Sequence, residues 1–519
     1  MKCYFRTNIT NSSGIGNYMR CLRLASKFRQ NGIKSTIFTD NNITLKENKF
    51  IKHEALYKNG RYISENKDAQ IFLKSIKEPG YIFLDDYRLG IKWQKEIKKT
   101  TNKLILITDF FHKKCIADFI INTKPDFLNP KLCDDFKKTC SENTKLLLGP
   151  KYSIIDKKKS FKKKKITNKF LIGFYFGGSG NLSIPLKIIK KIKDTSEVKN
   201  FVFYIFIGPY SKNKKKLLEF KKKNLVKIKI IDQSLKISEN FAKLDLLVSS
   251  AGVSIFESSL YKVPTILFQL VKNQKVNLDN LEKIGHYFLL NKSNLLETNK
   301  IAKLVVIFFK NKKRIKKIFS KNYLDDKGSE RIVKFILKNK TDLISRKLEK
   351  KDDHVFSENY KFEKITDFNI NKYLQVRNLE INRKYSINKK KINNIDHYIW
   401  WFDNNRESYF FKKGNNNLII FFQDKIKIAK KYFIIPGWYS FSNRISFLEI
   451  LKGIKAQYTM LMVQNKLKAT QIGIIDKKNI PMIKFAKNLN WLLLKKSDLL
   501  LNLLRKKIKI SKRFNYYKR

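Results

Sequence analysis

Two glycine-containing regions are the first candidates for ligand-binding loops. Near the N-terminus, an apolar segment runs through Arg6 into a polar turn that contains Gly14 and Gly16, and an amphipathic segment follows from Asn17. Glycines let backbone amides approach a ligand, and the start of a helix offers unpaired N–H groups to an anion. Any tight strand-to-helix turn can carry such a pair, so this region alone indicates only a site for an anionic ligand.

The second glycine region, in the middle of the chain, suits a nucleotide. Gly177 and Gly178 follow one apolar segment, and Gly252 follows another, shortly before Glu257. Such turns permit close backbone approach to a pyrophosphate, and a carboxylate one turn into the next helix can accept hydrogen bonds from both ribose hydroxyls. Taken singly, Gly252 would be an ordinary turn and Glu257 a charge that complements the helix dipole. Their arrangement favours ligand binding.

Three aspartates at strand ends are candidate proton acceptors. Asp85, Asp86 and Asp109 each follow an apolar segment, and a carboxylate that faces a sugar could deprotonate water. Asp85 and Asp109 could equally cap the helices that follow them. Asn17 can orient a water molecule or a hydroxyl but cannot accept a proton, because its amide does not titrate near neutral pH. The choice of base among the three aspartates stays open at this point.

Alternation of short apolar strands with amphipathic helices predicts the framework that holds these residues. The expected strands of the first half are 2–6, 34–39, 81–84, 103–108 and 119–122, with a helix at 17–30. Those of the second half are 170–176, 201–208, 226–231, 246–249 and 265–268. This rhythm is typical of parallel sheets covered by helices on both faces. We therefore expect an α/β fold with two Rossmann-like lobes, 1–155 and 170–340, a central cleft and a lysine-rich linker at 156–169.

The remainder of the chain has a different order of elements. A charged connector is expected at 341–354, followed by a third α/β domain at 355–500 that starts with helices. Its strands are predicted at 408–412, 417–423 and 431–435, and a long helix at 444–464. Residues 501–519 are leucine-rich and then basic, so we expect an amphipathic tail that packs on the body or contacts an anionic membrane.

The composition limits the classes of function. A formal net charge of +67 would attract nucleic acid, but the lysines are spread over nearly every predicted helix, which favours a solvated surface over specific nucleic-acid binding. Five cysteines without a C-x-x-C pair and five scattered histidines predict neither a disulfide framework nor a metal site. No secretory signal or membrane-spanning apolar run is seen, so a cytoplasmic protein is expected.

Residues 1–340 resemble a known enzyme family. The string Gly14-Ile-Gly16-Asn17-Tyr-Met-Arg20-Cys-Leu is similar to the G-x-G-H-x-M-R-C-L signature of the UDP-2,4-diacetamido-2,4,6-trideoxy-β-L-altropyranose hydrolases of pseudaminic acid biosynthesis. The resemblance continues, in order, through residues 84–87, 107–109, 148–152, 176–181, 249–257 and 273–274. In that family the histidine after the second glycine is taken as the base that activates water, and here Asn17 stands in its place.

The resemblance implies a glycosyltransferase-B-like fold, as in the enzymes that add N-acetylglucosamine to cell-wall lipid precursors, and a site for a UDP-sugar that requires no metal or cofactor. The candidates for a catalytic role are Asn17, Asp85 and Asp109. The expected substrate-binding residues are Arg6, Gly14, Gly16, Arg20, Tyr87, Gly177, Gly178, Ser250, Gly252, Ser254, Glu257, Asn273 and Gln274.

The third domain resembles the GCN5-related N-acetyltransferases of the same sugar pathway. The similarity rests on Arg377, Arg383 and His397 and on residues 400–401, 417–423 and 472–491. Such enzymes hold the pyrophosphate of acetyl-CoA in an arginine- and glycine-rich turn before a helix, whereas residues 437–444 here contain one glycine. The resemblance implies acetyl-CoA as a candidate cofactor, with Asn479 either reaching it or capping its own helix.

Three hypotheses about function follow. The first is a hydrolase of nonulosonic-acid or surface-glycan biosynthesis that cleaves the anomeric C–O bond of a UDP-sugar and releases UDP. The second is a glycosyltransferase, in which an acceptor hydroxyl replaces water. The third is a non-catalytic UDP-sugar-binding scaffold that keeps other enzymes of the sugar pathway together.

Overall fold

The computed structural model contains two compact units, Met1–Ile344 and Ser345–Arg519. The structure describes residues 2–9, 15–41, 51–57, 62, 64–110, 115–155, 169–178, 180–208, 210–223, 226–232, 240–271, 274–319, 324–338, 360–404, 406–428, 431–464, 470–508 and 513–519. The expected connector 341–354, residues 156–168 of the expected linker, Gly14 and Asn273 lie outside the described residues.

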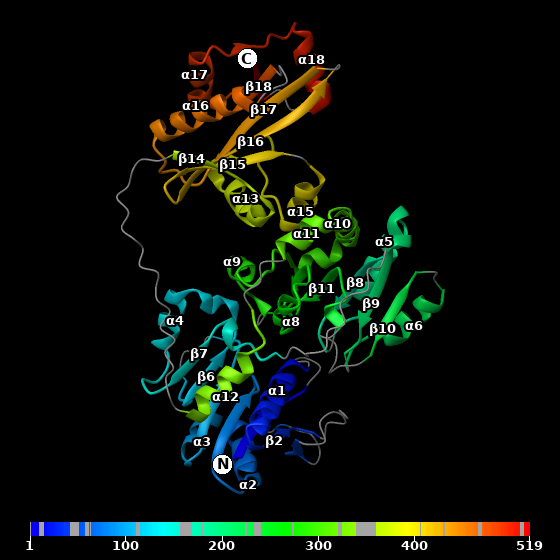
Figure 1. Cartoon of the computed structure of the whole chain (residues 1–519), viewed down its shortest axis with the longest axis vertical. Helices are drawn as coiled ribbons and strands as arrows, with labels where there is room; N and C mark the ends of the chain where they lie inside the picture. Colours follow the sequence, from blue (N-terminus) through cyan, green and yellow to red (C-terminus); the bar gives the residue numbers. More distant parts are fainter. Residues whose placement is uncertain are drawn as a thin grey trace. The chain divides into compact units, whose positions relative to one another are not determined.

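The first lobe of the N-terminal unit, blue to cyan in Figure 1, is a parallel sheet covered by helices. Its strands are β1 (Lys2–Thr7), β2 (Lys34–Thr39), β3 (Lys52–Ala55), β4 (Gly80–Asp85), β5 (Lys103–Ile107), β6 (Phe119–Asn122) and β7 (Lys145–Leu148). They pair in the order β3-β2-β1-β4-β5-β6-β7, and every neighbouring pair is parallel. The helices are α1 (Gly16–Gln30), α2 (Glu65–Ser75), α3 (Ile91–Lys98) and α4 (Pro130–Lys137). Strands such as β4 and β5 are almost continuous apolar runs because helices bury both faces of the sheet.

The second lobe, green in Figure 1, repeats this construction. Its strands are β8 (Phe170–Tyr175), β9 (Phe201–Phe206), β10 (Ile228–Ile231), β11 (Leu246–Ser250), β12 (Thr265–Gln269) and β13 (Phe288–Asn291). All pairs are parallel, in the order β10-β9-β8-β11-β12-β13. The helices are α5 (Ser183–Lys193), α6 (Lys214–Lys223), α8 (Ser254–Leu260), α9 (Leu278–Glu282), α10 (Thr298–Lys310) and α11 (Lys312–Ile318).

Both sheets have the strand order of a Rossmann-like fold. In each, the chain moves from the central strand to one edge and then returns to add strands on the other side. The loops after β1 and β4, and after β8 and β11, therefore leave in opposite directions at a topological switch point, where open α/β sheets bind ligands. The predicted α/β class with Rossmann-like lobes is confirmed. The short strands β3, β7 and β13 were not among the predicted strands.

The helix α12 (Gly328–Lys338) differs from expectation. It falls within the range predicted for the second lobe, but its Ile332, Val333 and Ile336 are buried in the same core as Phe5 of β1. Figure 1 shows this helix beside α1, which it contacts. An amphipathic pattern reveals which face of a helix is buried but not which sheet receives it, so this placement had no signal in the sequence.

The C-terminal unit is built on one mixed sheet. Its strands are β14 (Tyr360–Lys364), β15 (Glu407–Lys413), β16 (Asn416–Ile428), β17 (Lys431–Ser440), β18 (Thr470–Asp476), β19 (Leu492–Leu493) and β20 (Phe514–Lys518), in the order β14-β15-β16-β17-β18-β20-β19. The helices are α13 (Ile370–Arg377), α14 (Glu380–Arg383), α15 (Asn394–Asp403), α16 (Phe447–Gln464), α17 (Ile480–Asn488) and α18 (Leu499–Ile508). The strands β17 and β18 are parallel and, among the described residues, pair only through Phe433–Thr470 and Ile434–Gln471. Beyond these pairs the two strands diverge.

Two expectations about this unit need correction. It starts with the strand β14 rather than with helices. Residues 501–519, expected as a separate basic tail, belong to the fold: Leu501 and Leu504 of α18 and Phe514 of β20 are buried in one core, and β20 pairs with both β18 and β19. The apolar face of the segment is therefore used for packing, which was the alternative to membrane contact.

Three structural absences concern the described part of the chain. Within it, no helix combines the length and apolar character needed to cross a membrane. Nor do three or more His, Cys, Asp or Glu side chains gather there as they would around a metal ion. All five cysteines are free, and Cys3, Cys21 and Cys115 are buried.

Candidate functional site

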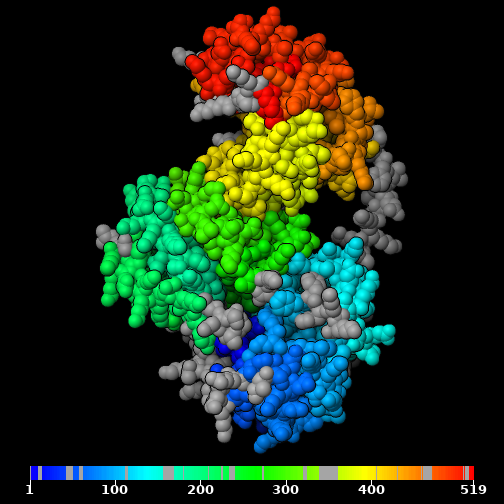
Figure 2. All heavy atoms as spheres, turned by 180° about the vertical axis from the view of Figure 1, so that it is seen from behind, coloured from blue at the N-terminus to red at the C-terminus, as the bar shows by residue number. Residues whose placement is uncertain are grey.

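A cavity of about 650 Å³, here called the cleft, lies between the two lobes of the N-terminal unit. Its walls come from the start of α1 and the loops after β4 and β5 in the first lobe, and from the loops after β8, β11 and β12 in the second. Figure 2 shows the green second lobe directly against the blue and cyan first lobe. Of the predicted residues, those that line the cleft are Gly16, Asn17, Arg20, Tyr87, Asp109, Gly177, Gly178, Ser250, Gly252, Ser254, Glu257 and Gln274.

The glycine turns of the two lobes meet at the cleft. A Cβ on Gly178 would lie 2.7 Å from Cγ2 of Ile15, just before α1, which is closer than side chains approach. A Cβ on Gly16 would lie 3.6 Å from Val253 of the second lobe. Gly177 has a φ of +84°, in the left-handed region that favours glycine. The glycines therefore bring the two backbones together around one cavity.

Arg20 of α1 organises the first-lobe wall. Its guanidinium donates to both carboxylate oxygens of Asp85, from Nε at 2.9 Å and from Nη2 at 2.8 Å. Its Nη1 donates to both oxygens of Asp109 at 2.8 and 3.0 Å, and the Tyr87 hydroxyl donates to Asp109 as well. Arg20 is 3% exposed and Asp85 is fully buried. Leaving a buried charge without its partner costs about 3–5 kcal/mol, so this network fixes the wall in one arrangement.

The carboxylates of this wall differ in what they can do. Burial raises the pKa of Asp85 to about 6, against the opposing pull of Arg20. Asp85 does not line the cleft, so it supports Arg20 rather than facing a ligand. At Asp109 burial acts upward on the pKa, but the Arg20 charge and the Tyr87 hydrogen bond bring the net pKa below its usual value. Asp109 lines the cleft and is therefore ionised near neutral pH where a ligand can reach it.

Asn17 is held by this network at the edge of the cleft. Its Nδ2 donates to the backbone oxygen of Asp85 at 3.3 Å, and its Oδ1 accepts from Arg20 Nη2 at 3.1 Å. Asn17 is 6% exposed and lines the cavity. Both ends of the amide are engaged by the protein, so Asn17 can contact a ligand but supplies no base.

Arg6 does not occupy the expected ligand-binding position. It is fully buried, where it donates to Asp68 from Nε at 3.0 Å and from Nη2 at 2.6 Å, and to Asp40 at 2.6 Å. It does not line the cleft. The neighbouring Arg88 pairs with Asp40 and Asp86 and does line the cleft, together with Asp86. Arg6 thus anchors the β1 strand end to the core, because a buried guanidinium requires charged partners.

An ion pair joins the two lobes beside the cleft. Arg23 Nη2 donates to Glu257 Oε1 at 2.5 Å, and Arg23 Nη1 donates to the backbone oxygen of Ile154 at 3.0 Å. The exposed fractions of the two side chains are 14% and 11%. Arg23 was not among the predicted site residues, although it follows Gly16 and Arg20 at the helical spacing that places all three on one face of α1.

The remaining predicted residues have defined places. Gln274 Oε1 accepts from the Leu270 amide at 3.0 Å and so braces the loop after β12. Ser254 Oγ lies 3.2 Å from the backbone oxygen of Ser250. Asn479 lies in the C-terminal unit, where its side chain accepts from the Met482 amide at 3.4 Å and caps α17. The cap alternative for Asn479 is therefore the one observed.

Part of the second lobe is similar in sequence to a known protein family. Residues 174–334 match the model of the glycosyltransferase family 28 C-terminal domain. The uncharacterized protein MJ1062 of Methanocaldococcus jannaschii is 28% identical in an alignment of 306 residues that covers 55% of this chain and 59% of that protein. The chain thus spans about three fifths of the length of that relative.

Two solved structures align with about two thirds of this chain. MurG of Acinetobacter baumannii covers 65% of this chain and all of its own, with 12% identity and a TM-score of 0.44. MnaA of S. aureus, in a co-structure with UDP, covers 66% of this chain and 98% of its own, with 14% identity and a TM-score of 0.43. The lobe that is similar to the glycosyltransferase family 28 C-terminal domain also has the Rossmann-like sheet order.

Proposed function

We propose that the N-terminal unit binds a UDP-sugar in the cleft and hydrolyses the bond between the anomeric carbon and the diphosphate, with release of UDP. The observation that carries this proposal is that Asn17 and Asp109 from one lobe share a cavity with Gly178, Gly252 and Glu257 from the other. Its volume of about 650 Å³ lies within the range of roughly 300–1,000 Å³ that suits small-molecule sites.

The second lobe is the place for the nucleotide. Gly178 and Gly252 let the backbone approach a diphosphate, since neither carries a side chain into the cavity. Glu257 can accept hydrogen bonds from ribose hydroxyls through Oε2, because Arg23 is bound to Oε1. The family match over 174–334 supports the same assignment.

The first lobe is the place for the sugar and for the attacking water. Asp109 is the base in this proposal, since it is ionised and faces the cleft. Water attacks the anomeric carbon as Asp109 accepts its proton, the anomeric C–O bond breaks, and the diphosphate leaves with the electron pair. Arg20 and Tyr87 hold Asp109 in position. Because they lower its pKa, Asp109 is a weaker base than a histidine, and slow turnover is expected.

Glycosyl transfer is the second candidate function. The match to a glycosyltransferase family over residues 174–334 favours it. In this reaction a hydroxyl of a sugar or lipid acceptor takes the place of water, and Asp109 accepts the hydroxyl proton. UDP release that requires an added acceptor would support transfer, whereas UDP release in buffer alone supports hydrolysis.

The test is a UDP-release assay with UDP-2,4-diacetamido-2,4,6-trideoxy-β-L-altropyranose, run with and without acceptors. We expect Asp109→Asn to abolish turnover but retain UDP binding, and Asn17→His to raise the rate by restoring the family's residue. Asp135→Asn is the matched control, because Asp135 is an exposed aspartate of α4 outside the cleft. UDP binding without turnover by the native chain or by Asn17→His, under all acceptors, would favour a scaffold and refute both enzyme proposals.

A further inference from the structure

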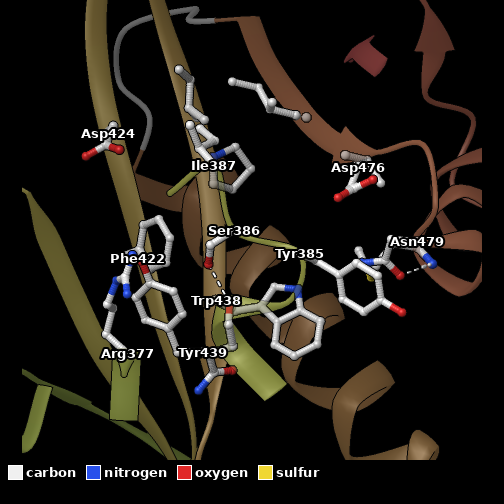
Figure 3. Close-up of a pocket in the computed structure, with 18 of the residues that line it drawn as sticks. Arg377, Tyr385, Ser386, Ile387, Phe422, Asp424, Trp438, Tyr439, Asp476 and Asn479 are labelled. Atoms are coloured by element: carbon white, nitrogen blue, oxygen red, sulfur yellow. Dashed lines mark hydrogen bonds between the residues drawn. The ribbon is translucent and has the colours of Figure 1, made fainter. Parts of the chain in front are cut away.

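The C-terminal unit contains a second cavity, here called the C-terminal cavity, of about 450 Å³. It opens where β17 and β18 diverge, and its walls include residues 435–439 of β17 and 473–476 of β18. Figure 3 shows Arg377 and Tyr439 together on one side of the Trp438 ring. The volume lies within the range of roughly 300–1,000 Å³ that suits small-molecule sites.

Arg377 of α13, which lines this cavity, differs from the other buried arginines. Within the described part of the chain, the buried arginines are Arg6, Arg20 and Arg377, and Arg377 is 5% exposed. Arg6 and Arg20 each use Nε and Nη2 to hold both carboxylate oxygens of an aspartate. The hydrogen bonds of Arg377 go instead to uncharged oxygens. A buried cation is stabilised by an anion, and an anion can reach Arg377 from the cavity.

The hydrogen bonds within the protein leave part of the Arg377 guanidinium for a ligand. Its Nη1 donates to Asn378 Oδ1 at 3.2 Å and to the backbone oxygen of Lys390 at 2.8 Å, and its Nη2 donates to the backbone oxygen of Asn388 at 2.5 Å. These three bonds use three of the five N–H donors of an arginine, so one donor on Nε and one on Nη2 remain. The Tyr439 hydroxyl interacts with the same guanidinium. Nε and Nη2 form the edge with which the other buried arginines hold carboxylates.

Further basic residues surround Arg377. Residues 385–388 line the cavity and are flanked along the chain by Lys384 and by the lysines 389–391. Burial lowers the pKa of Arg377, and the charge of Arg383 acts in the same direction. Arg383 itself donates to backbone oxygens. The field at this wall of the cavity therefore favours an anion.

The other charged groups of the cavity are paired. Arg406 donates to both carboxylate oxygens of Asp424 at 2.7 and 2.5 Å, and Arg513 donates to Asp476 at 2.5 Å. Among the described residues that line the cavity, Arg377 is therefore the cation that no carboxylate offsets, and none is a lysine. One such cation matches a singly charged carboxylate better than a phosphate group, which carries nearly two charges at neutral pH.

Aromatic rings supply much of the remaining surface. Trp438, Tyr385 and Trp491 line the cavity, and each is partly exposed. Flat aromatic rings pack favourably against another ring, in a stacked or an edge-to-face arrangement. The cavity thus combines a guanidinium with surfaces that suit the ring of a ligand.

The turn between β17 and α16 does not fit the pyrophosphate of acetyl-CoA. There is no glycine between Gly437 and Gly453, and a glycine-poor turn does not bring successive amides around a diphosphate. Gly437 itself is required by packing, since a Cβ there would lie 2.3 Å from the Phe422 ring. The Ser446 amide donates to the Glu449 carboxylate at 3.1 Å, so a negative charge already lies at the start of α16. The positive charge that faces the cavity comes from α13 instead.

We propose that the C-terminal cavity binds a small ring compound with one carboxylate, which Arg377 holds through Nε and Nη2 while Trp438 and Tyr385 contact the ring. The carboxylate of the ligand takes the role toward Arg377 that Asp85 has toward Arg20. This binding site is independent of the function proposed for the cleft, because it uses only residues of the C-terminal unit.

The experiment compares the binding of benzoate and of benzamide to the full chain by saturation-transfer NMR and calorimetry. The two probes share a ring and a planar substituent, but only benzoate is charged. We expect the native chain to bind benzoate about fivefold to thirtyfold more tightly, the difference between a charged and a neutral hydrogen bond. Phenyl phosphate separates a carboxylate site from a phosphate site, and it should displace benzoate less readily than benzoate displaces it.

Substitutions locate this preference in the cavity. Arg377→Gln should weaken benzoate binding by the same factor and leave benzamide binding unchanged. Trp438→Ala should weaken the binding of both probes about threefold to tenfold, because both use the ring contact. Arg444→Gln is the matched control, since Arg444 is an exposed arginine of the same unit outside the cavity. If Arg377→Gln does not fold, Arg377→Lys replaces it and should show a reduced preference for benzoate, because lysine lacks the paired donors.

Four results would overturn the proposal. The first is a native chain that binds benzoate no more tightly than benzamide, a result that requires no variant and so no assumption about folding. The second is a full preference for benzoate in the folded substitution of Arg377, which would place the bound anion elsewhere on this basic chain. The third is an equal loss of both probes in folded Arg377→Gln, which would mean that Arg377 only shapes the cavity. The fourth is phenyl phosphate that binds more tightly than benzoate and competes with it.

Discussion

Replacement of Glu257 by glutamine tests the nucleotide side of the cleft. In the ligand-free protein Glu257 Oε1 accepts from Arg23 at 2.5 Å, and the side chain is 11% exposed. Glutamine keeps the shape and the acceptor oxygen for Arg23 but removes the negative charge. The fold should therefore persist, while hydrogen bonds from ribose hydroxyls lose their ionic component.

The expected loss follows from the strengths of the two kinds of hydrogen bond. A hydrogen bond to a charged group contributes about 1.5–3 kcal/mol, and a neutral one about 0.5–1.5 kcal/mol. Each ribose contact should thus weaken by about 1–2 kcal/mol, so the Kd for UDP should rise roughly fivefold to thirtyfold for every hydroxyl that Glu257 binds. Because the effect is confined to the ribose, Glu257→Gln should also discriminate less between UDP and 2′-deoxy-UDP than the native chain does.

Isothermal titration calorimetry with UDP and 2′-deoxy-UDP measures both quantities. Glu219→Gln is a suitable control, since Glu219 lies on α6 and does not line the cleft. The reasoning is refuted if Glu257→Gln binds UDP as tightly as the native chain, or if the native chain binds 2′-deoxy-UDP as tightly as UDP.

Three further predictions concern the residues around the cleft. Arg20→Met leaves Asp85 and Asp109 without their cation, so the free energy of unfolding measured in urea should fall by about 3–5 kcal/mol; an unchanged midpoint would contradict the buried network. Gly178→Ala forces a clash with Ile15 and should lower the Tm. Gly252→Ala, whose Cβ would lie 3.8 Å from Gln274, should keep the native Tm but weaken UDP binding. Equal Tm values for the two variants would show that Gly178 and Ile15 are not in tight contact. Burial lowers the pKa of His286 from 6.5 to about 4, so its neutral form contributes stability that is complete above pH 6.5 and is lost as the pH falls to about 4, at most about 3 kcal/mol. In His286→Gln the free energy of unfolding in urea should change less between pH values above 6.5 and pH 4 than it does in the native chain. An equal change in both proteins would rule this out.

The sheets of the two lobes were predictable because their signal is local. Runs such as Lys103–Ile107 and Phe119–Asn122 are apolar over the length of a buried strand, and the glycine turns mark where each strand ends. In a parallel sheet the carboxyl ends of the strands lie along the same edge. The sequence could therefore predict that one site contains the residues after β1 and β4 of the first sheet and those after β8 and β11 of the second.

Long-range pairings were not predictable from the same patterns. The apolar face of α12 could cover either lobe, and only the structure shows it on the first. The leucines of α18 and the aromatic residues of β20 read as an amphipathic tail, because a strand at 514–518 has no alternation that distinguishes it from an exposed end.

The same limit applies to individual site residues. Arg6 and Arg20 both sit beside conspicuous motifs, and the sequence placed both at the ligand. The structure places Arg6 in the core, where it pairs with Asp68 of α2 and with Asp40 after β2, and places Arg20 at the cleft. The inter-lobe pair of Arg23 and Glu257 joins residues that are remote along the chain, so periodicity could show which helix face Arg23 occupies but not its partner.

The most direct test of the account is the position of UDP in a crystal of its complex with the full chain. We predict that the diphosphate lies against Gly178 and Gly252, that the ribose hydroxyls bind Glu257, and that the terminal β-phosphate faces Asp109. Density for UDP on any surface outside this cavity, with the cleft empty, would contradict the account.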